Sequence, residues 1–206
     1  MLKEPIIILS NGVFPTHSIP LIELDRAKTI ICCDGAADQL VKHGKIPDFV
    51  IGDLDSISLK TKLELSNHLI HFPNQDENDL RKAINWVNNQ GSKKVSILGA
   101  TGKREDHLLG NIFSILQYKT NMDMEIITDY GKFYIVDKQR NFKCIQKQEV
   151  SLFCLDPSIK ISTTGLKYEL QNVQIPTLYS GTLNEVIQEN FNIQLSHGKI
   201  LVYCAF

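Results

Sequence analysis

The chain has 206 residues, of which 43% are hydrophobic and 22% charged, which suffices for one large domain or two small ones and excludes a disordered chain. The formal net charge of −1 lacks the basic excess of a nucleic-acid-binding protein, so we expect no nucleic-acid partner. No apolar run is long enough to span a membrane, and the apolar residues 6–9 are too few for a signal-peptide core, so we expect a cytoplasmic protein with no membrane partner.

The first half of the chain alternates short apolar runs with helix-like segments. Unbroken apolar runs predict strands buried on both faces, as in a parallel sheet; they lie at residues 6–9, 29–33, 49–51 and 95–98. Helical spacing of apolar residues predicts one helix that begins near residue 77 and a second at 107–118. This alternation implies a doubly wound, mostly parallel α/β domain over residues 1–124.

The second half, residues 125–206, reads as strand after strand. Apolar or alternating runs separated by short polar turns predict a smaller antiparallel β-sandwich domain; they lie at residues 132–136, 150–155, 166–170 and 200–204. Because about 80 residues make a small core, we expect this domain to be stabilised by packing against the first domain or a second subunit.

The cysteines are odd in number, have no CxxC spacing and lie in apolar stretches. This pattern predicts buried free thiols rather than disulfides or a zinc site, and it fits a reducing compartment. The residues are Cys32, Cys33, Cys144, Cys154 and Cys204.

Carboxylates follow three of the four strands expected in the first half. Asp34 follows the second strand, Asp53 and Asp55 follow the third, and Asp106 lies in the loop after the fourth. A further acidic cluster, residues 74–79, opens the helix expected near residue 77. Because parallel strands end at one edge of a sheet, we expect these side chains to converge there.

Converging carboxylates are costly unless a cation lies among them. A magnesium ion with an anionic substrate would meet this need, because magnesium prefers a few carboxylates with water and phosphate oxygens. Asp53 and Asp55 would share one face of an extended segment and so suit one metal. Structural alternatives stay open: Asp53 and Asp55 as turn residues, Asp34 as a turn or cap, and Asp76 as a helix N-cap with Asp79 in the first turn.

The loop at residues 99–104 joins an expected strand to an expected helix. Gly99 and Gly102 would let the backbone approach a phosphate, while the helix N-terminus, Lys103 and Arg104 would add positive potential. Only two residues separate the glycines and Arg follows the Lys, which excludes a Walker A loop. Beside a carboxylate cluster, the loop is a candidate phosphate site.

Together these segments resemble thiamine pyrophosphokinase. No single piece is diagnostic, but the pieces keep the family's order and spacing over residues 30–115; they are residues 33–37, 47–57, 75–80, 99–107 and 109–111. Residues 165–168 and 182–185 are similar to two motifs that recur in the C-terminal half of that family. The resemblance implies an ATP- and magnesium-binding α/β domain and a thiamine-binding β-sandwich domain that forms a homodimer. It also implies transfer of the pyrophosphoryl group of ATP to the thiamine hydroxyl, with release of AMP.

Carried over by motif, the resemblance gives roles to individual residues. The metal ligands would be Asp53, Asp55 and Asp79, and the catalytic residues would be Asp55, Asp79 and Asp106. The ATP contacts would be Asp34, Gln75, Gly99, Gly102, Arg104, His107 and Asn111. The thiamine contacts would be Asp106, Tyr168, Thr182 and Asn184.

Two positions depart from the family pattern on the thiamine side. Tyr168 stands where the family often has Trp, and it can still stack on a cationic ring. Leu183 stands where the family often has Ser, and it cannot donate a hydrogen bond. Either Asp79 or Asp106 could accept the proton of the thiamine hydroxyl.

Two other functions fit part of the pattern. A haloacid-dehalogenase-type phosphatase would use Asp53 as nucleophile and Asp55 as acid and base, but that family has Thr or Val where Ile57 stands. A non-catalytic nucleotide- or thiamine-sensing module would use the same acidic strand ends as a binding site without turnover. Release of AMP separates the kinase from both alternatives.

Overall fold

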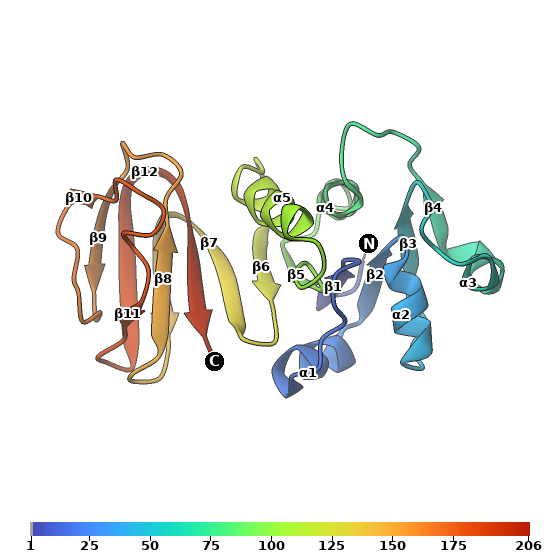
Figure 1. Cartoon of the computed structure of the whole chain (residues 1–206), viewed down its shortest axis with the longest axis horizontal. Helices are drawn as coiled ribbons and strands as arrows, with labels where there is room; N and C mark the ends of the chain where they lie inside the picture. Colours follow the sequence, from blue (N-terminus) through green and yellow to red (C-terminus); the bar gives the residue numbers. More distant parts are fainter. Residues whose placement is uncertain (1) are drawn as a thin grey trace. The chain divides into compact units, whose positions relative to one another are not determined.

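A computed structural model describes residues 2–206 and divides into two compact units, unit 1 (Met1–Asp129) and unit 2 (Tyr130–Phe206) (Figure 1). The division lies beyond residue 124, where the sequence pattern changes, because the strand β6 (Asp123–Ile127) pairs in parallel with β5 (Lys94–Leu98) and so belongs to unit 1. Within residues 2–206, no helix is both long enough and apolar enough to cross a membrane.

Unit 1 is built on a parallel sheet with the strand order β6-β5-β1-β2-β3-β4. The remaining strands are β1 (Ile6–Leu9), β2 (Thr29–Cys33), β3 (Phe49–Gly52) and β4 (Leu69–His71). Every residue of β1 and β2 is buried, as the unbroken apolar runs predicted.

Helices cover both faces of this sheet. They are α1 (Ser18–Arg26), α2 (Ala36–Lys42), α3 (Leu59–Glu64), the 3-10 helix η1 (Ser66–His68), α4 (Asp79–Asn89) and α5 (Glu105–Leu116). Figure 1 shows α1 and α2 on one face and α4 and α5 on the other. Alternate residues of β1, Ile7 and Leu9, pack in one cluster with Leu24 of α1 and Leu40 of α2. The doubly wound α/β prediction is confirmed.

Unit 2 is antiparallel and is organised around its last strand, β12 (Asn190–Ala205). Along one edge β12 pairs with β7 (Gly131–Lys143); along the other it pairs first with β9 (Lys160–Thr164) and then with β8 (Glu149–Phe153). The short strands β10 (Val173–Gln174) and β11 (Asn184–Glu185) extend β9 and β8 respectively. The register on β7 shifts between Gln194 and Lys199, where β12 changes its partner on the other edge.

The strand expected at residues 166–170 is wrong. Leu166 makes only an isolated bridge to Val186, and the segment turns back toward β9, where Leu170 and Thr163 exchange hydrogen bonds. The turn begins at Gly165, whose φ of 86° lies in the left-handed region. Leu166 is apolar because it is a core residue, and its full burial does not require a ladder of strand hydrogen bonds.

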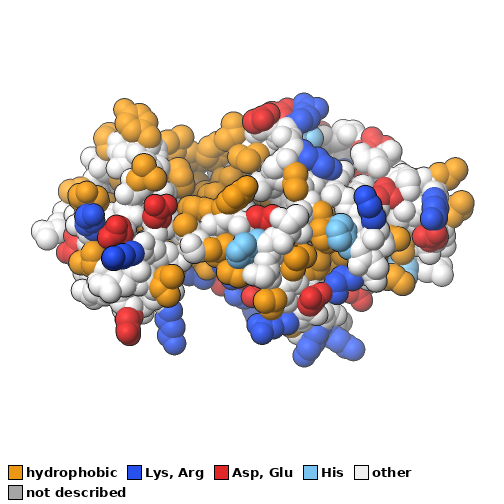
Figure 2. All heavy atoms as spheres, turned by 60° about the horizontal axis from the view of Figure 1, so that its bottom comes forward, with side chains coloured by type: hydrophobic (Ala, Val, Ile, Leu, Met, Phe, Trp, Pro, Cys, Tyr) orange, Lys and Arg blue, Asp and Glu red, His pale blue; other side chains and the backbone are white. Residues whose placement is uncertain are grey.

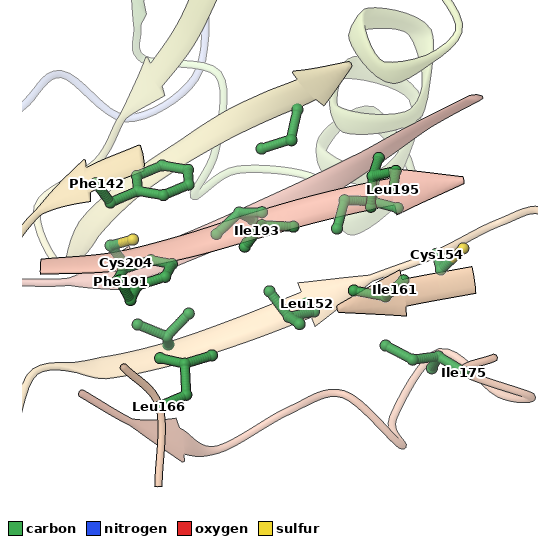
Figure 3. Packing of buried hydrophobic residues seen from close by; sticks show 14 of the residues in the cluster. Phe142, Leu152, Cys154, Ile161, Leu166, Ile175, Phe191, Ile193, Leu195 and Cys204 are labelled. Atoms are coloured by element: carbon green, nitrogen blue, oxygen red, sulfur yellow. The ribbon is translucent and has the colours of Figure 1, made fainter. Parts of the chain in front are cut away.

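Unit 2 has a hydrophobic cluster of its own, drawn in Figure 3. The rings of Phe142 and Phe191, on the paired strands β7 and β12, stack with centroids 4.6 Å apart. Ile193 and Leu195 of β12 lie in the same cluster as Leu152 of β8. On the face drawn in Figure 2, acidic and basic side chains are interspersed on the surface of each unit.

The cysteines are free, as predicted. Four of the five are buried, and Cys144 is half-buried. Burial raises the pKa of the Cys204 thiol to about 12, so this thiol stays protonated and unreactive near neutral pH.

Candidate active site

The strand order of unit 1 changes direction between β1 and β5. From β1 the chain builds β2, β3 and β4 on one side, while β5 and β6 lie on the other. Ligands of open α/β sheets bind outside the carboxyl ends of the strands at such a switch point. A cavity of about 460 Å³ lies there, lined by residues that follow β1, β3 and β5 and by the start of α4.

The loops after β1 and β5 are joined by backbone hydrogen bonds. The amide of Gly12 donates to the carbonyl of Gly99 at 2.7 Å, and the amide of Val13 donates to the carbonyl of Thr101 at 2.9 Å. A β-carbon on Gly12 would collide with the carbonyl oxygens of Gly99 and Thr101. Gly12 is therefore a requirement of this loop pair, although the sequence alone pointed only to Gly99 and Gly102.

Asp34 holds the loop after β3, residues 53–57, which we call the acidic loop. Its carboxylate accepts hydrogen bonds from the amides of Ser56 at 3.0 Å and Ile57 at 2.9 Å, and the residue is only 1% exposed. Burial raises the pKa of Asp34, the two amide hydrogen bonds oppose the rise, and the charges of Asp79 and Asp55 add to it. Asp34 thus holds the acidic loop in place through the backbone of Ser56 and Ile57.

Asp53 and Asp55 lie on a turn, so the extended segment expected between them is wrong. Leu54 has a φ of 64° and is buried in the core, and the amide of Asp55 donates to Asp53 Oδ1 at 3.3 Å. Carboxylate oxygens of Asp34, Asp53 and Asp55 all lie within 4.8 Å of one another. Gln75 donates to Asp53 Oδ2 at 2.8 Å, and this hydrogen bond is the main cause of the lowered pKa of Asp53. The turn buries Leu54 and still gathers the acids.

Asp79, the first residue of α4, lies on the rim of the same cavity. Its Oδ1 is 3.0 Å from Nζ of Lys82, whose side chain is 5% exposed. Gly52 leaves room for the side chains of Asp79 and Asp34. A β-carbon at position 52 would lie 3.1 Å from the Asp79 carboxylate carbon and 3.0 Å from the β-carbon of Asp34. Within residues 2–206, the group of three acids close enough to share one ion contains Asp34, Asp53 and Asp55, while Asp79 pairs with Lys82 instead.

Two asparagines connect α4 to the loop after β5. Asn78 caps α4, because its Oδ1 accepts a hydrogen bond from the amide of Arg81 at 2.9 Å; Asp76, the cap considered from the sequence, does not. Asn78 also donates to Asn111 Oδ1 at 3.2 Å, and Asn111 donates to the carbonyl of Ala100 at 3.0 Å. Both asparagines line the cavity, where Asn111 was expected as an ATP contact.

Arg104 and Asp106, expected on ATP and on thiamine respectively, bind each other. Nη2 of Arg104 lies 2.6 Å from Oδ2 of Asp106, and the Arg104 hydrogen bond lowers the pKa of Asp106. Both side chains are exposed, so this pair is readily exchanged for a ligand. The described lining of the cavity includes Gln75, Arg104 and His107 but not Asp106.

In unit 2, Asn184 fixes the backbone of Tyr168. Its Oδ1 accepts from the amide of Tyr168 at 3.1 Å, and its Nδ2 donates to the carbonyl of Tyr168 at 2.8 Å. The Tyr168 side chain is 63% exposed. The hydroxyl of Thr182 donates a hydrogen bond to the carbonyl of Tyr179 at 2.7 Å. The next residue, Leu183, has a φ of 59° and is exposed. The structure thus brings Tyr168 and Asn184 together and uses Thr182 in a turn.

Two family models cover almost the whole chain. The model described as "Thiamin pyrophosphokinase, catalytic domain" matches residues 22–128, and that described as "Thiamin pyrophosphokinase, substrate-binding domain" matches residues 131–203. The chain belongs to the thiamin pyrophosphokinase family. The resemblance inferred from the sequence is therefore confirmed, and family membership identifies the chain as an enzyme. Neither the phosphatase nor the sensing-module alternative is supported.

Named thiamine pyrophosphokinases resemble the chain in sequence and in fold. The chain is 29% identical to thiamine pyrophosphokinase of Bacillus subtilis (strain 168) over 95% of each chain, and 28% identical to thiamine pyrophosphokinase 1 of Oryza sativa subsp. japonica, over 91% of this chain and 82% of that protein. A crystal structure of the Bacillus subtilis thiamine pyrophosphokinase superposes with a TM-score of 0.80 at 24% identity, covering 97% of this chain and 98% of that one. The Candida albicans thiamin pyrophosphokinase gives a TM-score of 0.80 at 20% identity, covering 97% and 88%. These structures share the fold.

In this thiamin pyrophosphokinase family member, the cavity-lining residues that the sequence did not identify as site residues include Asn11, Gly12, Asn78 and Lys82. Gly12 and Asn11 follow β1, and the glycine at that strand end was the signal available for them. Asn78 directly precedes α4, where an asparagine is a common cap. Lys82 gave a weaker signal: it is a lysine among apolar residues of the inward face of α4.

Proposed function

We propose that the chain transfers the pyrophosphoryl group of ATP to the hydroxyl of thiamine, yielding thiamine diphosphate and AMP. The observation that carries the proposal is the gathering of Asp34, Asp53 and Asp55 next to the cavity of the β1–β5 switch point, which Asp53 of this group and the neighbouring Asp79 line. Membership in the thiamin pyrophosphokinase family supports the same substrates.

The donor set of the rim fits magnesium, which takes hard oxygen ligands. Asp53, Asp55 and Asp79 would hold the ion, and Asp34 would keep the acidic loop in place through Ser56 and Ile57. Bound there, magnesium would neutralise charge on the phosphate oxygens of ATP. Carboxylates this close favour a cation among them, because their charges otherwise repel.

The nucleotide would lie in the cavity against the loop after β5. Arg104 and His107 line the cavity and would face phosphate oxygens, while Gln75 would contact phosphate from the other rim. Gly99 and Gly102 keep the loop close to the loop after β1, since a β-carbon on Gly99 would meet the carbonyl oxygen of Ser10 at 2.5 Å. Asn111 would fix the loop by its hydrogen bond to Ala100.

Thiamine would be bound through unit 2 and Asp106. The exposed ring of Tyr168 would stack on the cationic thiazolium. Asn184 holds the backbone of Tyr168, and Thr182 lies in the neighbouring turn. We propose a homodimer, which the exposed apolar side chains of unit 2 support, among them Leu178, Tyr179 and Leu183. A cytoplasmic location fits the free cysteines.

The chain's part in the reaction is to position the reactants and to manage charge. The thiamine oxygen attacks the β-phosphorus while AMP leaves, so the protein must align the two oxygens and stabilise phosphate charge. The hydroxyl proton must pass to a base, for which Asp79 and Asp106 are the candidates. Arg104 lowers the pKa of Asp106, which makes this carboxylate the weaker base while that pair lasts.

Incubation of the purified chain with ATP, magnesium and thiamine, followed by mass spectrometry, tests this function. We expect AMP and thiamine diphosphate in equal amounts. Omission of thiamine controls for ATP hydrolysis. Formation of ADP and thiamine monophosphate would show attack on the γ-phosphorus and contradict the proposal.

A further inference from the structure

Lys82 differs from the other basic residue of its helix segment. Arg81 pairs with Glu77 at 2.9 Å with both side chains about one third exposed, as in an ordinary surface ion pair. Lys82 lies on the buried face of α4, among Leu80, Ala83 and Ile84. Its position would suit an apolar residue, because an ammonium is costly to bury without a partner.

The ammonium of Lys82 reaches the acidic rim. Nζ contacts Asp79 Oδ1 at 3.0 Å, and Lys82 itself lines the cavity. The charge of Lys82 also acts on Asp53 of the acidic loop. The Gln75 hydrogen bond is the main cause of the lowered pKa of Asp53, and the Lys82 charge lowers it further. Lys82 is thus a cation supplied by the chain itself at the site where a divalent cation would bind.

Two cations that use the same carboxylate repel each other. Asp79 Oδ1 is engaged by Lys82, while Asp34, Asp53 and Asp55 form the group close enough to share one ion. Binding of a divalent ion by Asp79 therefore competes with the Lys82 ammonium. A phosphate oxygen in the cavity relieves this competition, because it gives the ammonium another acceptor.

We propose that Lys82 is a positioning residue that acts as a built-in counter-cation of Asp79, lowering the affinity of the rim for a free divalent ion and favouring its binding together with the nucleotide. This inference rests on the proposed function, since it presumes that the rim holds a metal. It predicts that removing the lysine charge strengthens metal binding, whereas loss of a merely structural ion pair would leave metal binding unchanged or weaken it.

The test measures binding of Mn²⁺ alone, as MnCl₂, to the full chain by the electron paramagnetic resonance signal of free Mn²⁺. We expect Lys82→Met to bind Mn²⁺ about tenfold more tightly than the unmodified chain, the size of effect that one adjacent charge has on a carboxylate. Lys82→Arg retains the charge and should keep the original affinity. Lys62→Met is the matched control, because Lys62 donates to the carbonyl of Leu54 on the acidic loop and frees no carboxylate; we expect less than a twofold change.

Each outcome decides the inference. Equal or weaker Mn²⁺ binding by a folded Lys82→Met variant would overturn it and leave the proposed metal site standing. No Mn²⁺ binding by any of the proteins would contradict the metal site itself, and the inference would fall with it. If Lys82→Met does not fold, Lys82→Gln replaces it, since an amide can still donate to Asp79 without a charge, and the same tighter binding is expected.

Discussion

Units 1 and 2 both place polar side chains beside turns with positive φ, but they support these side chains in different ways. In unit 1 the buried carboxylate of Asp34 accepts a backbone hydrogen bond from the loop that contains the turn at Leu54. The loop after β5 is held by backbone hydrogen bonds to the loop after β1. In unit 2 the turn at Leu183 adjoins Asn184, whose amide holds the backbone of Tyr168 and leaves the ring exposed. Unit 1 therefore brings several loops together, whereas unit 2 exposes the single side chain of Tyr168, whose backbone is hydrogen-bonded to Asn184.

Substitutions in the two units should therefore change different kinetic constants. Side chains of unit 1 that are proposed to contact phosphate are expected to affect turnover, because they would act on charge in the transition state. Side chains of unit 2 are expected to affect thiamine binding, because the proposed function places them on the acceptor, away from the reacting atoms. The following variants test this difference between the units.

The largest effect is expected for Asp55→Asn in unit 1. Removing one carboxylate of the three-acid group should lower kcat by about 100-fold or more, because charge stabilisation at the phosphates is lost. Steady-state assays with ATP and thiamine measure the loss, and circular dichroism checks that the fold is retained. Near-normal turnover in a folded Asp55→Asn variant would remove Asp55 from the metal site.

A smaller effect, on stability, is expected for Gly12→Ala. The added β-carbon collides with the carbonyl oxygens of Gly99 and Thr101, which should cost about 1–3 kcal/mol of unfolding free energy. Gly110→Ala is the control, because apart from its chain neighbours and the backbone of its own helix no atom lies within 4 Å of the added β-carbon, and inside α5 alanine should gain about 0.5–1 kcal/mol. Urea unfolding measures both. Equal stability of the two variants would mean that the loops separate without cost.

The smallest effect is expected for Tyr168→Ala in unit 2. Loss of the exposed ring should raise the KM for thiamine about fivefold to tenfold and leave the KM for ATP within about twofold, the scale of one cation–π contact. Tyr168→Trp should restore or improve thiamine binding, since Trp has the stronger π face. A fall in kcat at unchanged KM for thiamine would erase the functional distinction between the two units.

The core strands of unit 1 were predictable because burial on both faces selects uninterrupted apolar runs, as in β1 and β2. β6 escaped prediction because Glu125 interrupts its apolar run. In the structure, Glu125 is buried and accepts a hydrogen bond from Ser96 Oγ at 2.8 Å, and Lys94 Nζ lies 3.1 Å from it. Only the paired strand explains how this charge is tolerated, and the sequence of β6 does not reveal the pairing.

The gathering of acids was predictable for a similar reason: parallel strands end at one edge, so Asp34 and Asp53 had to lie near each other. The contacts that arrange them were not predictable. The left-handed turn at Leu54 follows from burying its side chain in the core. The pairing of Asp79 with Lys82 depends on the burial of α4, and the pairing of Arg104 with Asp106 depends on the loop conformation.

The arrangement of β12 also has a consequence for the order of folding. β7, β8 and β9 each hydrogen-bond to β12, so during synthesis none of them finds its main partner before residues 190–205 have left the ribosome. The pairings between β7 and β12 also span long stretches of chain, which slows their formation. Unit 1, in contrast, can begin to fold from neighbouring β-α-β segments. A nascent chain should therefore complete the fold of unit 1 well before unit 2 can fold.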